Sequence, residues 1–331
     1  MSNIGVIGAG SWGTALAVTL CSNSHNVKIW DVDKNHVDEL KINKENKRFL
    51  QGVPFDEKLT AHDTLEETLH GAEVIVFSVP TQHFRSALNA ALPYIKENMA
   101  VVNAAKGIEQ KTLKRMSEIA YEHIDKSKYV VLSGPSHAEE VGRFMPTTLA
   151  AASADIKTAE YVQDVFMTDK FRVYTNHDVI GVEFGGALKN IIALGAGISD
   201  GMGYGDNAKA AMMTRGMAEM ARLGVKLGAE EKTFSGLTGI GDLIVTCTSM
   251  HSRNRRCGIM IGEGISPKEA TTRIGMVVEG MFTTEAAYEL AQKAGVEMPI
   301  TESIYHIINE KIEARDAVAQ LMTRGKKHEH E

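Results

Sequence analysis

The sequence predicts an α/β protein with a doubly wound, mostly parallel Rossmann-type sheet, followed by an all-helical C-terminal domain. Three observations predict this fold. Apolar runs alternate with helix-compatible segments up to about residue 180, a glycine-rich turn follows the first run, and the alternation then stops. A length of 331 residues suits about two domains. We expect them to cover residues 1–180 and 181–331.

The expected strands are short runs that stay apolar throughout, as strands covered on both faces of a sheet do. They lie at Ile4–Ile7, Val27–Trp30, Val74–Val79, Ala100–Ala104, Tyr129–Leu132, Thr147–Ala152 and Phe171–Tyr174. Helix-compatible segments between them include Thr14–Cys21, Lys34–Leu40 and Leu113–His123. This βαβ order favours a parallel sheet with helices on its faces.

The C-terminal half is expected to be helical. Apolar side chains recur there at spacings of three and four, which is more typical of core packing than of a methionine-rich binding surface. They are Met213, Met217, Met220, Leu223 and Leu227. Further helices are expected over Ser266–Ala294 and Ser303–Met322. The glycine-rich stretch Gly195–Gly205 is either a hinge or a helix break.

Composition and charge exclude several classes of protein. The net charge of −6 gives no bulk attraction to nucleic acid or anionic lipid. No uninterrupted apolar run approaches the ~20 residues of a membrane span, and no signal peptide is recognisable. Cys21, Cys247 and Cys257 lack zinc or disulfide-exchange spacing. We therefore expect a soluble cytoplasmic protein with buried reduced thiols, no metal, no integral membrane association and no nucleic-acid partner.

The turn Gly8-Ala9-Gly10-Ser11-Trp12-Gly13 follows the first strand and opens a helix. Gly8 permits the tight turn, and Gly10 lets the backbone approach a pyrophosphate. Gly13 lets the helix lie close to the strand. The helix N-terminus then offers free N–H groups to the phosphates. This context predicts a nicotinamide dinucleotide cofactor; a glycine turn without a ligand is the alternative.

Asp31 ends the second expected strand, 18 residues after Gly13. This is near the spacing of about 20 residues at which a carboxylate accepts from a ribose 2′-hydroxyl and repels a 2′-phosphate. Asp31 therefore favours NAD over NADP, and Asp33 adds negative charge. The alternative is that Asp31 caps the next helix.

Two lysines are candidates for the chemistry. Lys189 stands at one end of a run that is apolar on every side of a helix, so burial should lower its pKa and let it exchange protons near neutral pH. The alternative for a lysine on a buried helix is a stem that reaches the surface. Lys106 follows a strand at the edge where open α/β sheets bind ligands. The alternative for Lys106 is an exposed loop position.

Three further segments carry polar groups. Ser136 and Glu139 fit a capping box, so a helix should begin there. Asp242 follows two glycines. Ser252 to Arg256 forms the densest basic cluster, whose arginines suit a phosphate. The alternative for this cluster is a solvated helix face.

Together these segments resemble the NAD(P)-dependent glycerol-3-phosphate dehydrogenases of the bacterial type. The likeness covers nearly the whole chain in order, which makes it more specific than any single motif. It is carried by Gly8–Ala15, Ala105-Lys106-Gly107-Ile108, Ser133–Ala138, Gly185–Asn190, Gly239–Leu243, Ser252-Arg253-Asn254 and Val277-Val278-Glu279-Gly280.

The resemblance implies reversible reduction of dihydroxyacetone phosphate to sn-glycerol 3-phosphate in a cytoplasmic homodimer that supplies phospholipid synthesis. It implies that Lys189 is the general acid/base, assisted by Lys106 and Asp242. Substrate contacts are then expected from Lys106, Gly134, Ser136, Lys189, Asn190, Asp242, Ser252, Arg253 and Asn254. Dinucleotide contacts are expected from Ser11, Trp12, Lys106, Ala138, Arg253, Val277 and Glu279, beside the turn glycines and Asp31.

The chain departs from this family at the end of the second strand. Similar enzymes often carry histidine or arginine there, where this chain reads Asp31-Val32-Asp33. We therefore expect NADH to be preferred, with NADPH possible.

Two rival functions remain. One is a dehydrogenase of a hydroxy acid or sugar acid, which would ignore a phosphorylated triose. The other is a non-catalytic dinucleotide sensor, which would not need Lys106, Lys189 or Arg253.

Overall fold

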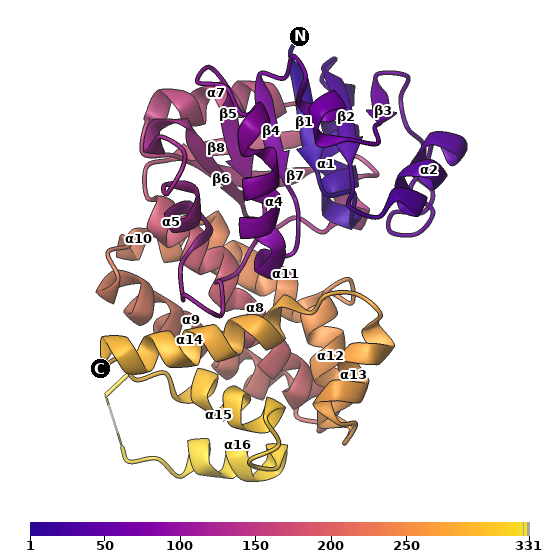
Figure 1. The fold of residues 1–331 in the computed structure, drawn as a ribbon. Coiled ribbons are helices and arrows are strands. Elements are labelled where there is room, and N and C mark those ends of the chain that lie inside the picture. The colour runs from indigo at the N-terminus through magenta and orange to yellow at the C-terminus, as the bar shows by residue number, and fades with distance from the viewer. Residues whose placement is uncertain (327, 330–331) are drawn as a thin grey trace.

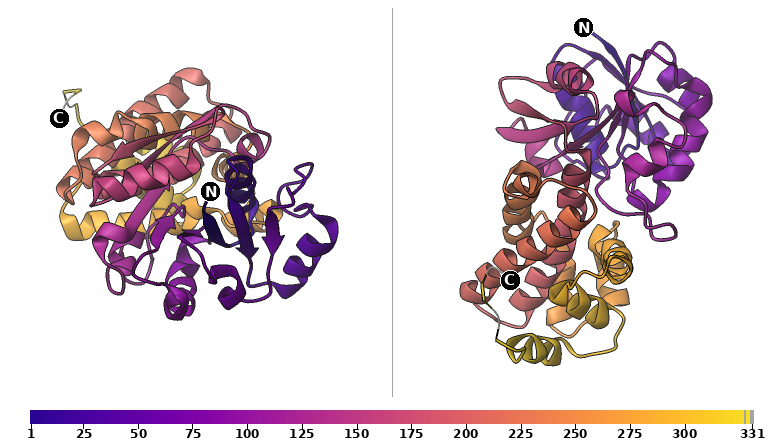
Figure 2. Two further views of the ribbon diagram at one scale, coloured as in Figure 1. Left: turned by 90° about the horizontal axis from the view of Figure 1, so that it is seen from above. Right: turned by 90° about the vertical axis from the view of Figure 1, so that its left-hand side faces the viewer.

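The chain folds into a sheet-containing N-terminal part and a helical C-terminal part that lie against each other along one side (Figures 1 and 2). The computed structural model describes residues 1–326 and 328–329. Residues 327, 330 and 331, which belong to the second predicted domain, lie outside the described residues. The predicted fold class, a Rossmann-type sheet followed by helices, is confirmed.

The sheet has eight strands in the order β3-β2-β1-β4-β5-β6-β7-β8. Every neighbouring pair is parallel except β6 and β7, which are antiparallel. The strands are β1 (Asn3–Ile7), β2 (Asn26–Trp30), β3 (Leu59–Ala61), β4 (Val74–Phe77), β5 (Ala100–Asn103), β6 (Tyr129–Ser133), β7 (Thr147–Ala152) and β8 (Phe171–Asn176). The strand order reverses between β1 and β4, and such a reversal opens a ligand crevice at the carboxyl ends.

Alternating strand residues supply two separate cores, one on each face of the sheet. Val6 packs into the core under α1 (Ser11–Ser22) and α7 (Ile156–Phe166), whereas its neighbour Ile7 packs on the opposite face. The helices between strands also include α2 (Lys34–Asn43), α3 (Leu65–Leu69), α4 (Phe84–Ala91), α5 (Met116–Ala120) and α6 (Ala138–Val141), with 3₁₀ turns η1 (Thr81–His83), η2 (Leu92–Tyr94) and η3 (Lys126–Lys128). Both faces are therefore covered, as the apolar strand pattern predicts.

The helical part is arranged around α8 (Val179–Gly201), most of whose residues are buried. Around it lie α9 (Asp206–Lys226), α10 (Glu231–Phe234), the π-helical turn η4 (Leu237–Gly241), α11 (Asp242–Thr248), α12 (Arg253–Gly262), α13 (Pro267–Ile274), α14 (Glu279–Ala294), α15 (Pro299–Ile308) and α16 (Ala314–Met322). The expected boundary between residues 180 and 181 falls in the first turn of α8.

Among the described helices, α8 alone is long and apolar enough to cross a membrane, and 94% of its most apolar stretch is buried inside the molecule. The predicted absence of a membrane-length apolar segment therefore holds for uninterrupted apolar runs, but not for the whole of α8. The core helix of a globular protein has the same length and composition, and this one is packed on all sides. The apolar face of α9 is also core, since Met220 and Leu223 are fully buried. All three cysteines are buried and unpaired, as predicted.

Three predicted helices were too long. The segment Leu113–His123 contains only the short α5, because Leu113 has a positive φ of 61° that a helix does not allow. Ser266–Ala294 is interrupted at Gly275, whose left-handed φ of 68° ends α13. Ser303–Met322 divides into the end of α15 and α16, with Glu310 at a positive φ between them.

Gly195–Gly205 is a helix end rather than a break within a helix: α8 continues to Gly201, and α9 starts at Asp206. Gly197 and Gly201 face two glycines of α12, Gly258 and Gly262, and the helix backbones touch. A Cβ on Gly258 would lie 2.1 Å from Leu194 O, and one on Gly197 would lie 2.1 Å from Arg255 O. Absent side chains at these four positions let α12 dock directly on α8.

Gly258→Ala is expected to destabilise the protein by at least the 1–3 kcal/mol that overpacking costs, because the clashing atom is a backbone carbonyl that cannot rotate away. Urea unfolding measures the loss. Gly205→Ala is the matched control, since no atom lies within 4 Å of its Cβ position. Equal stability of the two variants would show that α12 shifts without cost.

Candidate active site

The glycine-rich turn lies at the carboxyl end of β1, between β2 and β4. Gly8 adopts a φ of +101°, and its N–H donates to Trp30 O at 2.8 Å. A Cβ on Gly13 would lie 1.9 Å from Gly8 O, whereas nothing lies within 4 Å of the Cβ position of Gly10. Gly8 and Gly13 therefore shape the turn, and Gly10 leaves an open approach to the backbone. No side chain caps α1, so this cradle fits the pyrophosphate of a dinucleotide.

Asp31 is held against this turn. Its carboxylate accepts from Ala9 N at 2.8 Å and from Asp33 N at 3.1 Å. Asp33, not Asp31, caps α2, through acceptance from Asn35 N and His36 N. The alternative reading of Asp31 as a helix cap is therefore wrong. Each oxygen of Asp31 keeps a lone pair for another donor.

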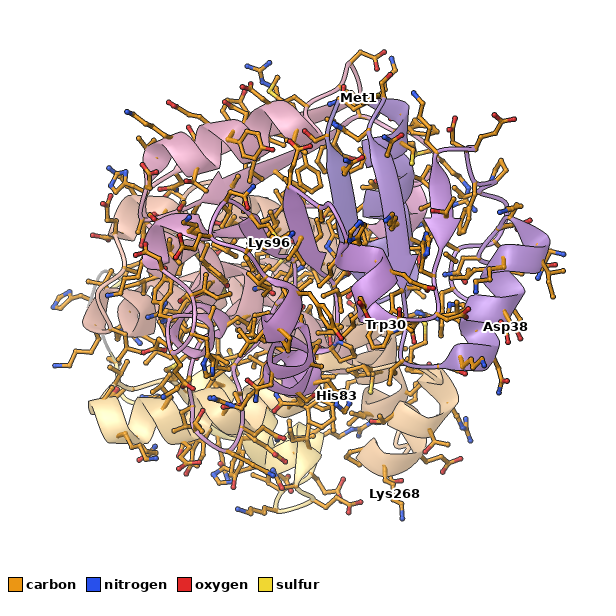
Figure 3. The ribbon with its side chains drawn as sticks, turned by 45° about the horizontal axis from the view of Figure 1, so that its top comes forward. Met1, Trp30, Asp38, His83, Lys96 and Lys268 are labelled. Atoms are coloured by element: carbon orange, nitrogen blue, oxygen red, sulfur yellow. The ribbon has the colours of Figure 1, made fainter. Side chains whose placement is uncertain are left out.

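The carboxyl edge of the sheet faces the helical part. In Figure 3, Trp30 marks the end of β2 and His83 the turn after β4, both on the side away from Met1. Ser11 and Trp12 begin α1 at this edge, and the indole Nε1 of Trp12 is buried without a partner in the described structure. Ala138 begins α6, and this helix packs on α1.

Val277 and Glu279 reach the same edge from the helical part. Val277 lies in the connection before α14, and Glu279 is the first residue of that helix. Glu279 Oε1 accepts from Thr81 N, at the start of η1, at 2.9 Å. Its other oxygen is buried without a partner among the described residues, and burial raises its pKa. A buried acceptor of this kind is free to bind a ligand donor at the crevice.

The two candidate lysines meet on one carboxylate. Lys106 Nζ donates to Asp242 Oδ2 at 2.8 Å, and Lys189 Nζ donates to Asp242 Oδ1 at 2.5 Å. Asp242 is 1% exposed and Lys189 6% exposed, so the alternative of a lysine that reaches solvent is wrong. Lys106 comes from the sheet edge, whereas Lys189 and Asp242 come from α8 and α11. The cluster therefore joins both parts of the chain.

Burial and neighbouring charge set the protonation of this cluster. Desolvation lowers the pKa of Lys189 to about 8; Asp242 opposes that shift, and the positive charge of Lys106 adds to it. Desolvation works against ionisation of Asp242, but the charges and hydrogen bonds of the two lysines outweigh it, so its pKa is lowered. Near neutral pH, Lys189 thus holds a proton that it releases readily.

The segment after β6 closes one side of the cluster. Lys106 Nζ donates to Gly134 O at 2.8 Å and lies 3.3 Å from Ser136 Oγ. Ser136 Oγ donates to Gly134 O at 2.9 Å rather than capping a helix. The predicted capping box is therefore wrong: α6 starts at Ala138, and its N-cap, His137, makes no side-chain cap bond. Ser136 is instead placed beside a candidate catalytic lysine.

The basic cluster divides into separate roles. Ser252 caps α12 by accepting from Arg255 N at 3.2 Å. Arg255 is paired with Asp200 at the end of α8, at 2.8 Å. Arg253 makes no hydrogen bond or ion pair among the described residues. Burial lowers its pKa, and the charge of Glu279 opposes that shift. The Nε atom of Arg256 is also buried without a partner among the described residues, so Arg253, beside Glu279, and Arg256 are both open to an anionic ligand.

The two candidate asparagines form a bridge between helices. Asn254 Nδ2 donates to Asn190 Oδ1 at 2.9 Å, and Asn254 Oδ1 accepts from Gly280 N at 2.8 Å. Asn190 Nδ2 lies 3.4 Å from Lys106 O. Each amide NH₂ carries two hydrogens, so one N–H of Asn254 stays open for a ligand while the bridge holds α12 and α14 to α8.

Sequence reasoning missed two residues that shape the cluster. Thr246 Oγ1 accepts from Lys189 Nζ at 2.8 Å and donates to Asp242 O at 2.5 Å. Its position four residues after Asp242, on the same helix face, was a usable signal. Glu183 accepts from Ser117 N at 2.8 Å and Tyr129 Oη at 2.9 Å, and pairs with Arg115. These contacts fix α8 to the chain segment that follows Lys106.

A Rossmann-type sheet with an open glycine-rich turn, beside a buried lysine poised to exchange a proton, defines a nicotinamide-dependent dehydrogenase. Two models of the NAD-dependent glycerol-3-phosphate dehydrogenase, one for its N-terminus and one for its C-terminus, match residues 3–159 and 178–319. The chain belongs to this family of oxidoreductases.

Relatives and a solved structure agree with this family along the whole chain. A Bacillus velezensis glycerol-3-phosphate dehydrogenase [NAD(P)+] is 52% identical over 334 residues, which is 100% of this chain and 97% of the relative. Its Clostridium perfringens counterpart is 50% identical over 99% of both chains. The crystal structure of glycerol-3-phosphate dehydrogenase from Coxiella burnetii is 39% identical, with a TM-score of 0.94 over 98% of this chain and 99% of that one. The predicted resemblance is confirmed.

Proposed function

We propose that this protein reversibly reduces dihydroxyacetone phosphate to sn-glycerol 3-phosphate with NADH, and so supplies glycerophospholipid synthesis. The observation that carries the proposal is the Lys106–Asp242–Lys189 cluster, buried at the carboxyl edge of the sheet. A buried proton donor at this edge supports hydride transfer from a dinucleotide bound in the glycine-rich turn. Family membership supports the choice of substrate.

The phosphate of the substrate is assigned to the start of α12. Arg253 has an uncommitted guanidinium, Asn254 an open N–H, and Ser252 lies at the N-cap of a ten-residue helix. A guanidinium and a helix N-terminus both favour phosphate oxygens. Gly134, Ser136 and Asn190 line the same region, so we assign the triose to the space between α12 and Lys106.

The protein contributes charge and a proton to the reaction. Its bound coenzyme supplies the hydride. Lys106 and Lys189 point their ammonium groups toward the carbonyl oxygen at C2, and Lys189 gives up its proton as negative charge develops there. Asp242 fixes both ammonium groups and keeps Lys189 protonated at neutral pH. In the oxidation direction, neutral Lys189 takes the proton from the C2 hydroxyl.

The coenzyme is assigned to the glycine-rich turn and its neighbours. Gly8, Gly10 and Gly13 shape the pyrophosphate cradle, and Asp31 turns its remaining lone pairs to the adenosine ribose. The other assigned contacts are Ser11, Trp12, Lys106, Ala138, Arg253, Val277 and Glu279. Two carboxylates near the end of β2, Asp31 and Asp33, support the preference for NADH over NADPH, although the family uses both.

We further propose that residues 1–180 and 181–331 act as dinucleotide-binding and substrate-binding domains of a cytoplasmic homodimer. The direct test of the function follows NADH absorbance with dihydroxyacetone phosphate, then with dihydroxyacetone and a 2-oxo acid. Turnover should require the phosphate. Faster turnover of the 2-oxo acid would overturn the substrate, and NADH binding without turnover of any of them would point to a sensor.

The pH dependence should differ between the two directions of the reaction. Reduction needs protonated Lys189, so its kcat/KM should be flat below the pKa of about 8 and fall as pH rises through it. Oxidation needs neutral Lys189, so its kcat/KM should rise over the same pH range. Initial rates from pH 6 to 10 in both directions test this, at about tenfold per pH unit along each slope. Slopes of the same sign in both directions would contradict it.

A further inference from the structure

The end of β2 carries an exposed ion pair beside the glycine-rich turn. Asp33 Oδ2 pairs with Arg48 Nη1 at 2.9 Å, and the two side chains are 41% and 53% exposed. The other oxygen, Oδ1, caps α2 by accepting from Asn35 N at 3.1 Å and His36 N at 3.4 Å. The hydrogen bond from Arg48 lowers the pKa of Asp33. The carboxylate is therefore ionised and has both oxygens occupied.

Arg48 is fixed in this place by the same turn that forms the dinucleotide cradle. Asn46, two residues before it, donates from Nδ2 to Ala9 O at 2.8 Å and to Thr14 Oγ1 at 2.7 Å. Phe49, the residue after Arg48, donates its N–H to Asn46 Oδ1 at 3.0 Å. The guanidinium of Arg48 lies 5.0 Å from the centre of the Phe49 ring. Asn46 thus ties the segment that carries Arg48 to the turn, and the Arg48 side chain itself is 53% exposed.

This location matters because NADH and NADPH differ by one phosphate on the adenosine ribose. In a Rossmann-type domain that ribose lies at the end of the second strand, and an arginine nearby accommodates the 2′-phosphate. The single hydrogen bond from Arg48 Nη1 leaves other N–H groups of the guanidinium open, but Asp33 neutralises its charge, and the carboxylate itself repels a phosphate. Released from Asp33, Arg48 would present an unpaired guanidinium at that position.

We propose that Asp33 sets the coenzyme preference by holding Arg48: the Asp33–Arg48 pair excludes a 2′-phosphate, and loss of the acid converts Arg48 into its ligand. This inference rests on the proposed use of a nicotinamide dinucleotide. It adds the Asp33–Arg48 pair to Asp31, whose carboxylate accepts from the backbone of the turn and keeps lone pairs for the ribose.

Asp33→Asn is the sharpest test. Asparagine caps helices as well as aspartate does, so α2 stays capped while the charge that holds Arg48 is removed. NADPH should bind about 10- to 100-fold more tightly, the change expected when one close repulsive charge becomes an attractive one near the surface. NADH affinity should change little. Both coenzymes can be titrated by quenching of the only two tryptophans, Trp12 and Trp30, which lie at this site.

Asp33→Asn combined with Arg48→Ala should lose the gain in NADPH affinity. Asp125→Asn is the matched control for net charge. Asp125 also caps a short helical turn and accepts from Ser127 N. It precedes β6 and so lies at the amino ends of the strands, away from the carboxyl ends that carry the glycine-rich turn. Its NADPH affinity should match that of the unmodified protein. Asp33→Ser, another good cap, must reproduce the effect of Asp33→Asn.

Three results would overturn the inference: no tighter NADPH binding in either Asp33 variant, a gain that persists without Arg48, or an equal gain in Asp125→Asn. These are distinguishable from failure of the proposed function. If the unmodified protein binds neither coenzyme, the dinucleotide itself is wrong. If it binds NADH and reduces dihydroxyacetone phosphate while the variants keep its coenzyme preference, only the role of the Asp33–Arg48 pair is wrong.

Discussion

Replacement of Lys189 by alanine is expected to lower kcat for dihydroxyacetone phosphate reduction by about 10²- to 10⁴-fold, the range of general acid–base catalysis. The loss is this large because Lys106, the neighbouring ammonium, is already committed to Gly134 O and Asp242. Alanine suits the interior of α8, and Asp242 keeps Lys106 as a counter-ion. The fold and the affinity for NADH should therefore be retained, which a thermal melt and a coenzyme titration measure.

Lys293→Ala is the matched control for this substitution. Lys293 also lies on a helix and is paired with a carboxylate, Glu289, at 2.8 Å, but it is 63% exposed. Its removal should leave both kcat and stability unchanged. Turnover of Lys189→Ala within a few-fold of the unmodified protein would assign the proton transfer to another group.

Asp242→Ala is expected to destabilise the folded protein more than Lys189→Ala does. It leaves two ammonium groups in a buried site without the carboxylate that neutralises them, and removal of one partner of a buried pair costs about 3–5 kcal/mol. The pKa of Lys189 should fall below about 8, since the opposing charge of Asp242 is gone. Urea unfolding should show the loss at neutral pH, and the pH profile of reduction should shift to lower pH.

The direction in which the stability loss of Asp242→Ala changes with pH shows whether unpaired charge causes that loss. A lysine whose folded pKa lies below its unfolded value destabilises the folded state until both forms are neutral, so the deficit of Asp242→Ala should shrink at alkaline pH. Asp63→Ala, which breaks the exposed pair with Lys41, is the control and should show neither effect. A pH-independent deficit in Asp242→Ala would mean that lost packing, rather than unpaired charge, is responsible.

The fold was largely predictable because its signals are local. Glycines at positions 8, 10 and 13 between a strand and a helix define the turn without knowledge of the rest of the chain. Seven strands were recognisable as continuous apolar runs. β3 escaped because Leu59–Ala61 has only three residues, one of them polar. Helix ends at Gly275 and Glu310 were missed because single left-handed residues interrupt patterns that otherwise continue.

The site was predictable residue by residue but not as an arrangement. Burial of Lys189 follows from its apolar surroundings in the sequence. Asp242, 53 residues later, accepts a hydrogen bond from Lys189, and Lys106 shares the same carboxylate. Both contacts depend on how α11 packs between the sheet edge and α8, which no local pattern shows. Ser136 was misread as a cap because the pattern of a capping box says nothing of a nearby lysine that competes for the hydroxyl.

The shared carboxylate of Asp242 has a consequence for how the chain can be divided. Lys106 is encoded in the first half of the sequence, and Lys189 and Asp242 in the second, so a break in the connection at residues 177–178 would separate the lysines. Neither fragment alone would hold a complete set of catalytic groups. Two fragments produced together would regain turnover only where their surfaces reassemble, which makes enzyme activity a direct reporter of their association.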